Sequence, residues 1–146
     1  MGWGEDDVNI PFIISTNIGK ATTDITAKVS GQTLRAYTMN NSFNGQVDIS
    51  GYIDITTFSV GSVNLTVDYT DENGAVHTGD IIPLASAAGA VGTPATAAGF
   101  FKAMKVRINV LANTTITVKT AGTFTSLTYN AGCSIEQVNN QAYGVN

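Results

Sequence analysis

The chain has 146 residues, the length of one domain, and it can bury a hydrophobic core without disulfides or a structural metal. Only 12% of the residues are charged, about half of the usual share, while 43% are hydrophobic. Such a charge-poor surface is expected where other protein covers much of it, although a small, highly expressed β-domain also tolerates it.

The charge balance argues against nucleic-acid binding. The formal net charge is −4, and Lys102, Lys105 and Arg107 form the one cluster of basic residues, too small for neutralising a phosphate backbone. No apolar run approaches the length of a membrane span, so no membrane partner is expected. The single cysteine, Cys133, cannot form an internal disulfide and is predicted to be a small core residue.

Period-two alternation of apolar and polar residues is the main local signal, and it predicts strands. Short candidates, bounded by Gly, Asn or Ser, come first at residues 12–14, 24–29 and 33–39. Val47 with Ile49 and Ile53 with Ile55 then share a face. Because Ser50 and Gly51 separate the two pairs, this stretch is either a strand with a bend or a short hairpin.

The clearest strand has Val63, Leu65, Val67 and Tyr69 on one face. It leads into the sequence DENG at residues 71–74, whose Asn-Gly pair suits a hairpin turn, and then into a return strand over residues 75–84.

Two further strands are predicted near the C-terminus. Alternation at residues 105–110 resumes at Ile116 and Val118 after a turn over 112–114, which predicts a second hairpin. A final strand places Leu127, Tyr129, Ala131, Cys133 and Ile135 on one face. With no persistent helical period, we expect an all-β chain of seven to nine short strands, an antiparallel β-sandwich of jelly-roll or related Greek-key type.

We expect a single β-sandwich domain over residues 10–146, with a long loop inside it and an N-terminal arm before it. Residues 85–99, reading ASAAGAVGTPATAAG, form a long loop that is either a contact arm, a mobile loop or, at 85–90, a helical turn. Residues 1–9 are an N-terminal contact arm, whose Trp3 either docks on a partner or covers the rim of its own sandwich. The candidate partner contacts are Trp3, Glu5, Asp6 and Asp7 in the arm, and Val91 and Pro94 in the loop.

Little in the sequence indicates catalysis or a cofactor. The only histidine, His77, is more typical of a satisfied hydrogen-bonding residue than of a catalytic base, and one Cys with one His cannot build a zinc site. Asp68, Asp71, Glu72 and Asn73 have the spacing of a turn, not that of an EF-hand calcium loop. We therefore expect no enzyme, no catalytic residue, no cofactor and no metal. A glycan site would need exposed aromatic residues beside amides, and the candidates are Tyr37, Asn40, Phe43 and Asn44, with Tyr52 nearby.

Four segments, taken in order, resemble a family of β-sandwich modules in virion structural proteins of tailed bacteriophages. They are TNIGKATTDIT (16–26), SVNLTVDYTDENGAVHTGDIIPL (62–84), MKVRINVLANTTITVKTAG (104–122) and LTYNAGCSIEQV (127–138). The match covers about two-thirds of the chain, but residues 27–46 are longer than the family pattern and the arm has no counterpart.

The resemblance implies a structural role. Since no shaft or coiled coil is attached, it favours a capsid decoration (cement) protein, expected as a homotrimer that binds the major capsid protein on the outer head surface after assembly in the host cytoplasm. The alternative is a tail- or fibre-associated virion protein that binds a host receptor or glycan.

Overall fold

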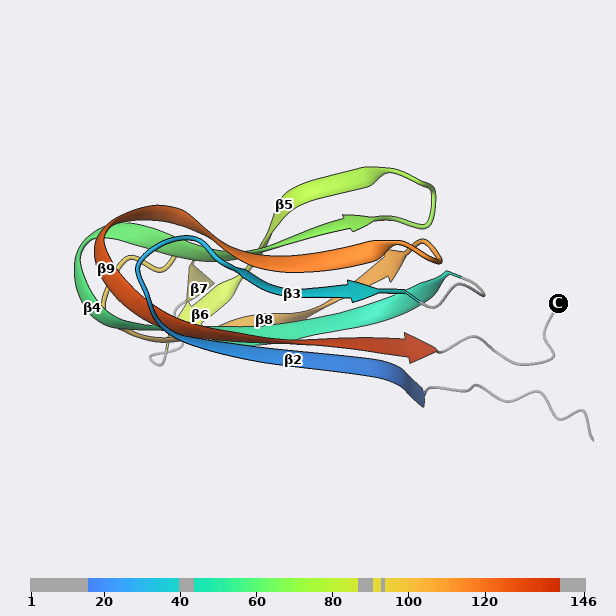
Figure 1. Cartoon of the computed structure of the whole chain (residues 1–146), viewed down its shortest axis with the longest axis horizontal. Helices are drawn as coiled ribbons and strands as arrows, with labels where there is room; N and C mark the ends of the chain where they lie inside the picture. Colours follow the sequence, from blue (N-terminus) through green and yellow to red (C-terminus); the bar gives the residue numbers. More distant parts are fainter. Residues whose placement is uncertain (1–15, 40–43, 87–90, 93, 140–146) are drawn as a thin grey trace, which may run out of the picture.

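The computed structural model describes residues 16–39, 44–86, 91–92 and 94–139 (Figure 1). This part of the chain forms eight antiparallel strands and no helix, and so includes no membrane-spanning helix. The strands are β2 (Thr16–Lys28), β3 (Thr33–Thr38), β4 (Gly45–Thr70), β5 (Val76–Ile82), β6 (Leu84–Ser86), β7 (Val91–Gly92), β8 (Gly99–Val110) and β9 (Thr115–Asn139).

One continuous sheet folds over on itself to make two layers (Figure 1). In the first layer the order is β2, the second half of β9, the first half of β4, then β8, β6 and β7. In the second layer it is β3, the first half of β9, the second half of β4, and β5. The predicted all-β antiparallel sandwich is confirmed.

Two glycines allow β4 and β9 to pass together from one layer to the other. Gly61 has φ 138° and Gly122 has φ 148°, conformations that residues with a Cβ rarely adopt. The two strands stay paired through this bend, with Ser62 opposite Thr123. A Cβ on Gly122 would overlap the carbonyl oxygen of Ser62, so the backbones can approach this closely only without a side chain there.

The core lies between the layers and follows the predicted alternation. Its largest fully buried hydrophobic side chains are Ile49, Ile53, Ile55, Leu65, Ile82, Leu84, Ile116, Tyr129 and Ile135. The Tyr37 hydroxyl from the second layer donates to Gln137 Oε1 in the first at 3.1 Å. The predicted inward position of Cys133 is confirmed, and burial raises the pKa of its thiol to about 11.

The number of strands agrees with the prediction, but their length does not. β4 has 26 residues and β9 has 25, whereas short strands were expected. Glycines usually signal a strand boundary, and here Gly61 and Gly122 sit within strands that bend and continue. Of the two interpretations of residues 47–55, the bent strand is correct, with a register irregularity between Ile49 and Gly51.

The hairpin predicted between residues 105 and 118 is wrong. β8 pairs with β4 and β6 in the first layer, whereas β9 begins in the second layer beside β3 and β4. The intervening turn, with Asn113 at φ 61°, crosses between layers. Alternation shows which side chains face the core but not which strand is the neighbour, because both layers turn their apolar faces to the same core.

The hairpin predicted over residues 63–84 is confirmed as far as Ile82, with β5 paired to the end of β4. Leu84 instead begins β6, which pairs with β8 in the first layer. The turn of the hairpin is held by Asp71, whose side chain accepts hydrogen bonds from the backbone N–H of Asn73 at 2.9 Å and of Ala75 at 3.0 Å. Gly74 alone in this turn has a positive φ, of 87°.

The described residues of the segment 85–99 include strand residues as well as loop. β6 pairs with β7, and Ala95 is buried and exchanges two backbone hydrogen bonds with Val63, of 2.9 and 3.0 Å. Small side chains permit this close docking. Residues 87–90 and 93, and the predicted short strand at 12–14, lie outside the described residues.

Candidate interaction face

Polar side chains form regular rows across the outer face of the first layer. One row joins Asp24, Gly132, Tyr52 and Lys102, on β2, β9, β4 and β8 in that order. These residues share a face because antiparallel register places directly opposed residues on the same side of the sheet.

Asp48 is the most buried charge on this face, with only 4% of its side chain exposed. Arg107, directly opposite on β8, donates from Nε to Oδ1 at 2.7 Å and from its terminal nitrogen to Oδ2 at 2.9 Å. Lys105 Nζ lies 3.2 Å from Oδ2. The hydrogen bond from Arg107 holds the pKa of Asp48 below its usual range, although burial opposes the shift. The site thus fixes two cations at the surface.

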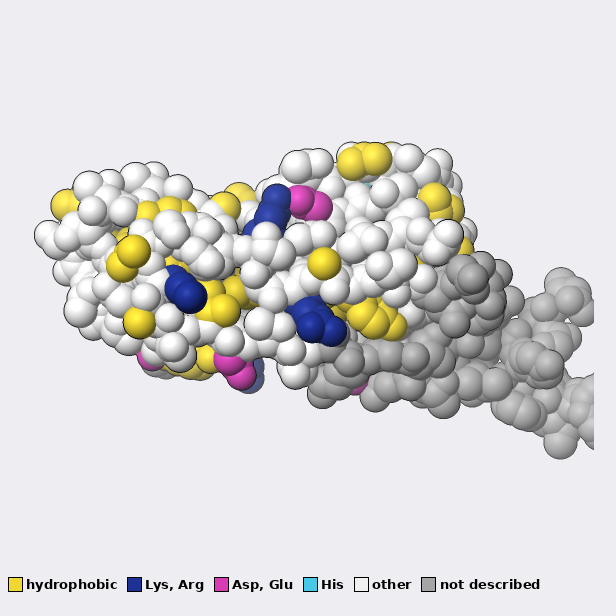
Figure 2. Space-filling model, viewed as in Figure 1, with side chains coloured by type: hydrophobic (Ala, Val, Ile, Leu, Met, Phe, Trp, Pro, Cys, Tyr) yellow, Lys and Arg dark blue, Asp and Glu magenta, His cyan; other side chains and the backbone are white. Residues whose placement is uncertain are grey.

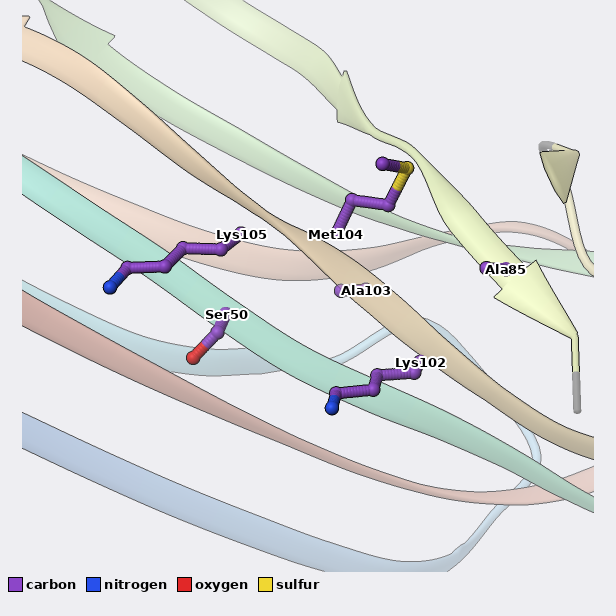
Figure 3. A pocket seen from close by; sticks show the side chains of 6 residues that line it. All are labelled: Ser50, Ala85, Lys102, Ala103, Met104 and Lys105. Atoms are coloured by element: carbon purple, nitrogen blue, oxygen red, sulfur yellow. The ribbon is translucent and has the colours of Figure 1, made fainter. Parts of the chain in front are cut away.

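A hollow of about 470 Å³ lies next to this cluster. Its lining is mainly apolar and consists of Ser50, Ala85, Lys102, Ala103, Met104 and Lys105. Figure 3 shows Lys102 and Lys105 extending from β8 to the side of Ser50 on β4, while Met104 points the opposite way. The hollow therefore combines an apolar floor with two ammonium groups.

A second hollow, of about 350 Å³, lies on the other side of β4 and includes Asp24, Tyr52 and Gly132 in its lining. The Tyr52 hydroxyl donates to Asp24 Oδ1 at 3.1 Å, and its ring stacks on Phe100 with centroids 5.4 Å apart. A Cβ on Gly132 would overlap both Asp24 and the Tyr52 ring, so this glycine makes room for them. The result is an aromatic platform edged by a carboxylate.

His77 belongs to a separate cluster on the β4–β5 hairpin. Its Nε2 is 2.9 Å from Asp71 Oδ2 and its Nδ1 is 3.3 Å from Asp80 Oδ2, while its ring stacks on Tyr69 at 4.5 Å between centroids. The hydrogen bond with Asp71 raises the pKa of His77, and the charge of Asp80 adds to the shift. His77 is the satisfied hydrogen-bonding residue that the sequence predicts.

Protonated His77 is expected to stabilise the folded chain. Because its pKa is raised on folding, this contribution is complete below the unfolded value of about 6.5 and disappears as pH rises through the higher folded value. Nuclear magnetic resonance titration of this single histidine should give a pKa above about 6.5. Asp71→Asn should lower it and Asp54→Asn should not; a wild-type pKa at or below the unfolded value contradicts the prediction.

Asp48→Asn is expected to lower the free energy of unfolding by about 1–3 kcal/mol at neutral pH, since Arg107 loses its charged acceptor. The pKa of Asp48 is depressed on folding, so its contribution is present above about pH 3.9 and is lost as pH falls through the folded value. Urea unfolding at neutral and strongly acidic pH should therefore show the two proteins converging in acid. Asp54→Asn is the control, and an equal difference at both pH values would contradict the assignment.

The candidates predicted from sequence are only partly within the described residues. Trp3, Glu5, Asp6, Asp7, Asn40 and Phe43 lie outside them. Pro94 is exposed, and Val91 pairs through its backbone with Ala85. Tyr37 is half-buried against Gln137, and Asn44 Oδ1 accepts the Ala112 N–H at 2.9 Å.

Sequence reasoning missed the role of Asp48 and Phe100. Both lie on β4–β8 register rows, so their partners Arg107 and Tyr52 become neighbours only when those strands pair. The one available signal was the basic cluster on β8.

Across the described residues, no three His, Cys, Asp or Glu side chains come together as a metal-binding group. The strand pairing and the rows on the first layer define the described chain as an all-β sandwich protein with a polar, partly aromatic outer face.

No family model and no curated protein matches the chain. Several solved structures are similar to it. A chain in the structure of infectious bursal disease virus Gx strain has a TM-score of 0.42 and 11% identity, over 90% of this chain. This chain spans 34% of that viral chain. The SPBc2 prophage-derived protein YomS has a TM-score of 0.34 and 12% identity, over 82% of this chain and 97% of YomS. The CBM22-1 xylan-binding domain of Paenibacillus barcinonensis Xyn10C has a TM-score of 0.41 and 14% identity, over 92% of this chain and 85% of that domain. We derive no function from these distant similarities.

Proposed function

We propose that the protein is a virion structural protein of a tailed bacteriophage, and specifically a capsid decoration protein. The observation that carries the proposal is the ordered set of segments that resemble the phage modules. All four fall on strands of the two layers: residues 16–26 lie within β2, and the segments 62–84, 104–122 and 127–138 cover parts of β4, β5, β6, β8 and β9.

The architecture suits a mechanical role. β4 and β9 run through both layers and remain paired from Gln46 opposite Val138 to Asp68 opposite Thr117. The layers are therefore joined by two covalent backbones, which stay paired through three register irregularities at the bend, as well as by the core. These two covalent connections limit how far the layers can move apart under load, which favours a module that carries force between neighbouring subunits.

The surface suits burial against other protein. Figure 2 shows charged side chains few and well separated on the visible face, with neutral atoms between them. Desolvation of such a surface on binding is less costly than that of a densely charged one. Standard interfaces bury roughly 1,600 Å². In our proposal the protein, as a homotrimer, contacts the major capsid protein on the outer head surface of the virion, after assembly in the host cytoplasm, and catalyses no reaction.

Binding to expanded phage capsids that lack the protein tests this function. We expect cosedimentation at micromolar protein and a higher capsid melting temperature, because added interfaces must be broken before the shell opens. Tail particles without heads serve as the control. Absence of binding to heads would overturn the proposal, and binding to tails alone would establish the alternative of a tail-associated protein.

A second candidate function is attachment to a host glycan, and the exposed Phe100 ring stacked on Tyr52 favours it. Aromatic faces edged by a few polar groups are typical of ligand sites. On a glycan array, Phe100→Ala should abolish binding. Met104→Ala is a matched control, because Met104 lies on the same strand and is 48% exposed against 47% for Phe100. No array signal from the wild-type protein would exclude this candidate.

A further inference from the structure

We propose that residues 3–7 of the chain dock in cis on the hollow beside β8. Trp3 would occupy the apolar floor, and the carboxylates of Glu5, Asp6 and Asp7 would face Lys102 and Lys105. The inference does not depend on the proposed function, because it concerns the isolated chain.

Charge complementarity points to this segment as the occupant. β8 carries three of the seven basic residues of the chain, at 102, 105 and 107, and Asp48 forms ion pairs with Lys105 and Arg107 but not with Lys102. These four side chains together carry a net charge of +2. Among the described carboxylates, none lies within ion-pair distance of Lys102. A run of three acidic residues supplies the missing opposite charge.

The rest of the outer face is unsuited to an acidic segment. Asp24, Asp54 and Glu136 lie on β2, β4 and β9, on the side of β8 away from β6, and their charges would repel the carboxylates of residues 5–7. Like charges placed next to one another repel, which disfavours binding of an acidic segment at those positions. The basic residues of β8, between β4 and β6, are thus the part of this layer that an acidic segment would bind.

The hollow also suits an indole ring. Its volume of about 470 Å³ is well within the range of ligand pockets, and Ala85 and Ala103 contribute to its apolar lining. The stems of Lys102 and Lys105 extend that lining, while their ammonium groups can lie over an aromatic face. Trp3 is the only tryptophan of the chain, and such anchors bind in apolar pockets with a polar rim.

The chain is long enough to make this contact with its own sandwich. The distance from Thr16 to Lys102 has two parts. Along β2, Thr16 is eight residues from Asp24, and across the layer Lys102 is three strand spacings from Asp24 in the same row. At about 3.3 Å per residue and 4.8 Å per strand, the separation is roughly 30 Å. The thirteen steps from residue 3 to residue 16 can span about 43 Å when extended.

The fluorescence of Trp3 gives a direct test with the purified full chain. In the folded wild type we expect blue-shifted emission and slow quenching by acrylamide relative to the urea-unfolded chain. The double variant Lys102→Glu, Lys105→Glu should shift the emission to the red and speed quenching, whereas Lys28→Glu, a lysine on β2, should leave both unchanged. Restoring complementarity with Glu5→Lys and Asp6→Lys in the double variant should recover the blue shift.

Three outcomes would overturn the proposal. The first is wild-type emission equal to that of the unfolded chain, and the second is emission that the charge reversal leaves unaltered while circular dichroism shows a folded protein. The third is a blue shift that vanishes on dilution, which would assign the site to a second copy. Since none of these measurements involves capsids, failure here and failure of the proposed function are distinguishable.

Discussion

Replacing Gly122 with alanine is expected to lower the free energy of unfolding by about 2–6 kcal/mol, the combined range for backbone strain and overpacking. Gly122 has φ 148°, and a Cβ there would overlap the backbone carbonyl of Ser62 on the paired strand. Backbone cannot rotate away as a side chain can, so β4 and β9 must separate at the point where both change layers. Urea denaturation followed by circular dichroism measures the loss.

Gly79→Ala is the matched control, because it separates backbone strain from steric overlap. Gly79 has φ 69°, but a Cβ there meets no atom within 4 Å. Its substitution should cost only the left-handed penalty of about 1–2 kcal/mol. Equal losses at the two positions would show that the close strand approach at Gly122 is not what requires glycine.

Tyr129→Ala is the second substitution with a large expected effect, a loss of about 3–5 kcal/mol. The side chain is fully buried on β9, and its ring stacks on Phe124 with centroids 5.7 Å apart. Truncation leaves a large cavity between the layers, which two paired long strands cannot collapse to fill. Calorimetry should show the lower unfolding temperature.

The hydroxyl of Tyr129 accounts for a separable part of that loss. It donates a hydrogen bond to Ser30 O at 2.7 Å, and this bond links β9 to the segment between β2 and β3. It also lies 2.6 Å from Thr120 Oγ1 on β9. Tyr129→Phe should therefore cost about 1–3 kcal/mol. In a double-mutant cycle with Thr120→Val, the two losses should not add. Full additivity would contradict a shared hydrogen bond.

The local pattern predicted much of the core correctly. Residues that alternate along the chain, such as Val63, Leu65 and Val67, are buried, and Leu127 to Ile135 place every predicted residue inward. This works because a strand with one buried face must alternate whatever its neighbours are. The same pattern could not predict that β8 and β9 lie in different layers, since both turn their apolar faces to one core.

The interaction face shows the same division. The polar character of Asp48, Tyr52 and Lys102 was visible as alternation, and the basic cluster was visible as spacing. That Asp48 is nearly buried under Arg107, or that Tyr52 stacks on Phe100, follows from the register of β4 against β8. Partners 59 and 48 residues apart in the chain have no local signature.

From the sequence alone follow the all-β class, the inward face of each principal strand, the buried cysteine and the sparse surface charge, because these depend on composition and on the two-residue period of a strand. Only the tertiary structure decided that Gly61 and Gly122 are bends within strands, which strands are neighbours, and where the cations of β8 gather. Those features depend on backbone pairing between distant segments, and pairing is a property of the folded chain as a whole.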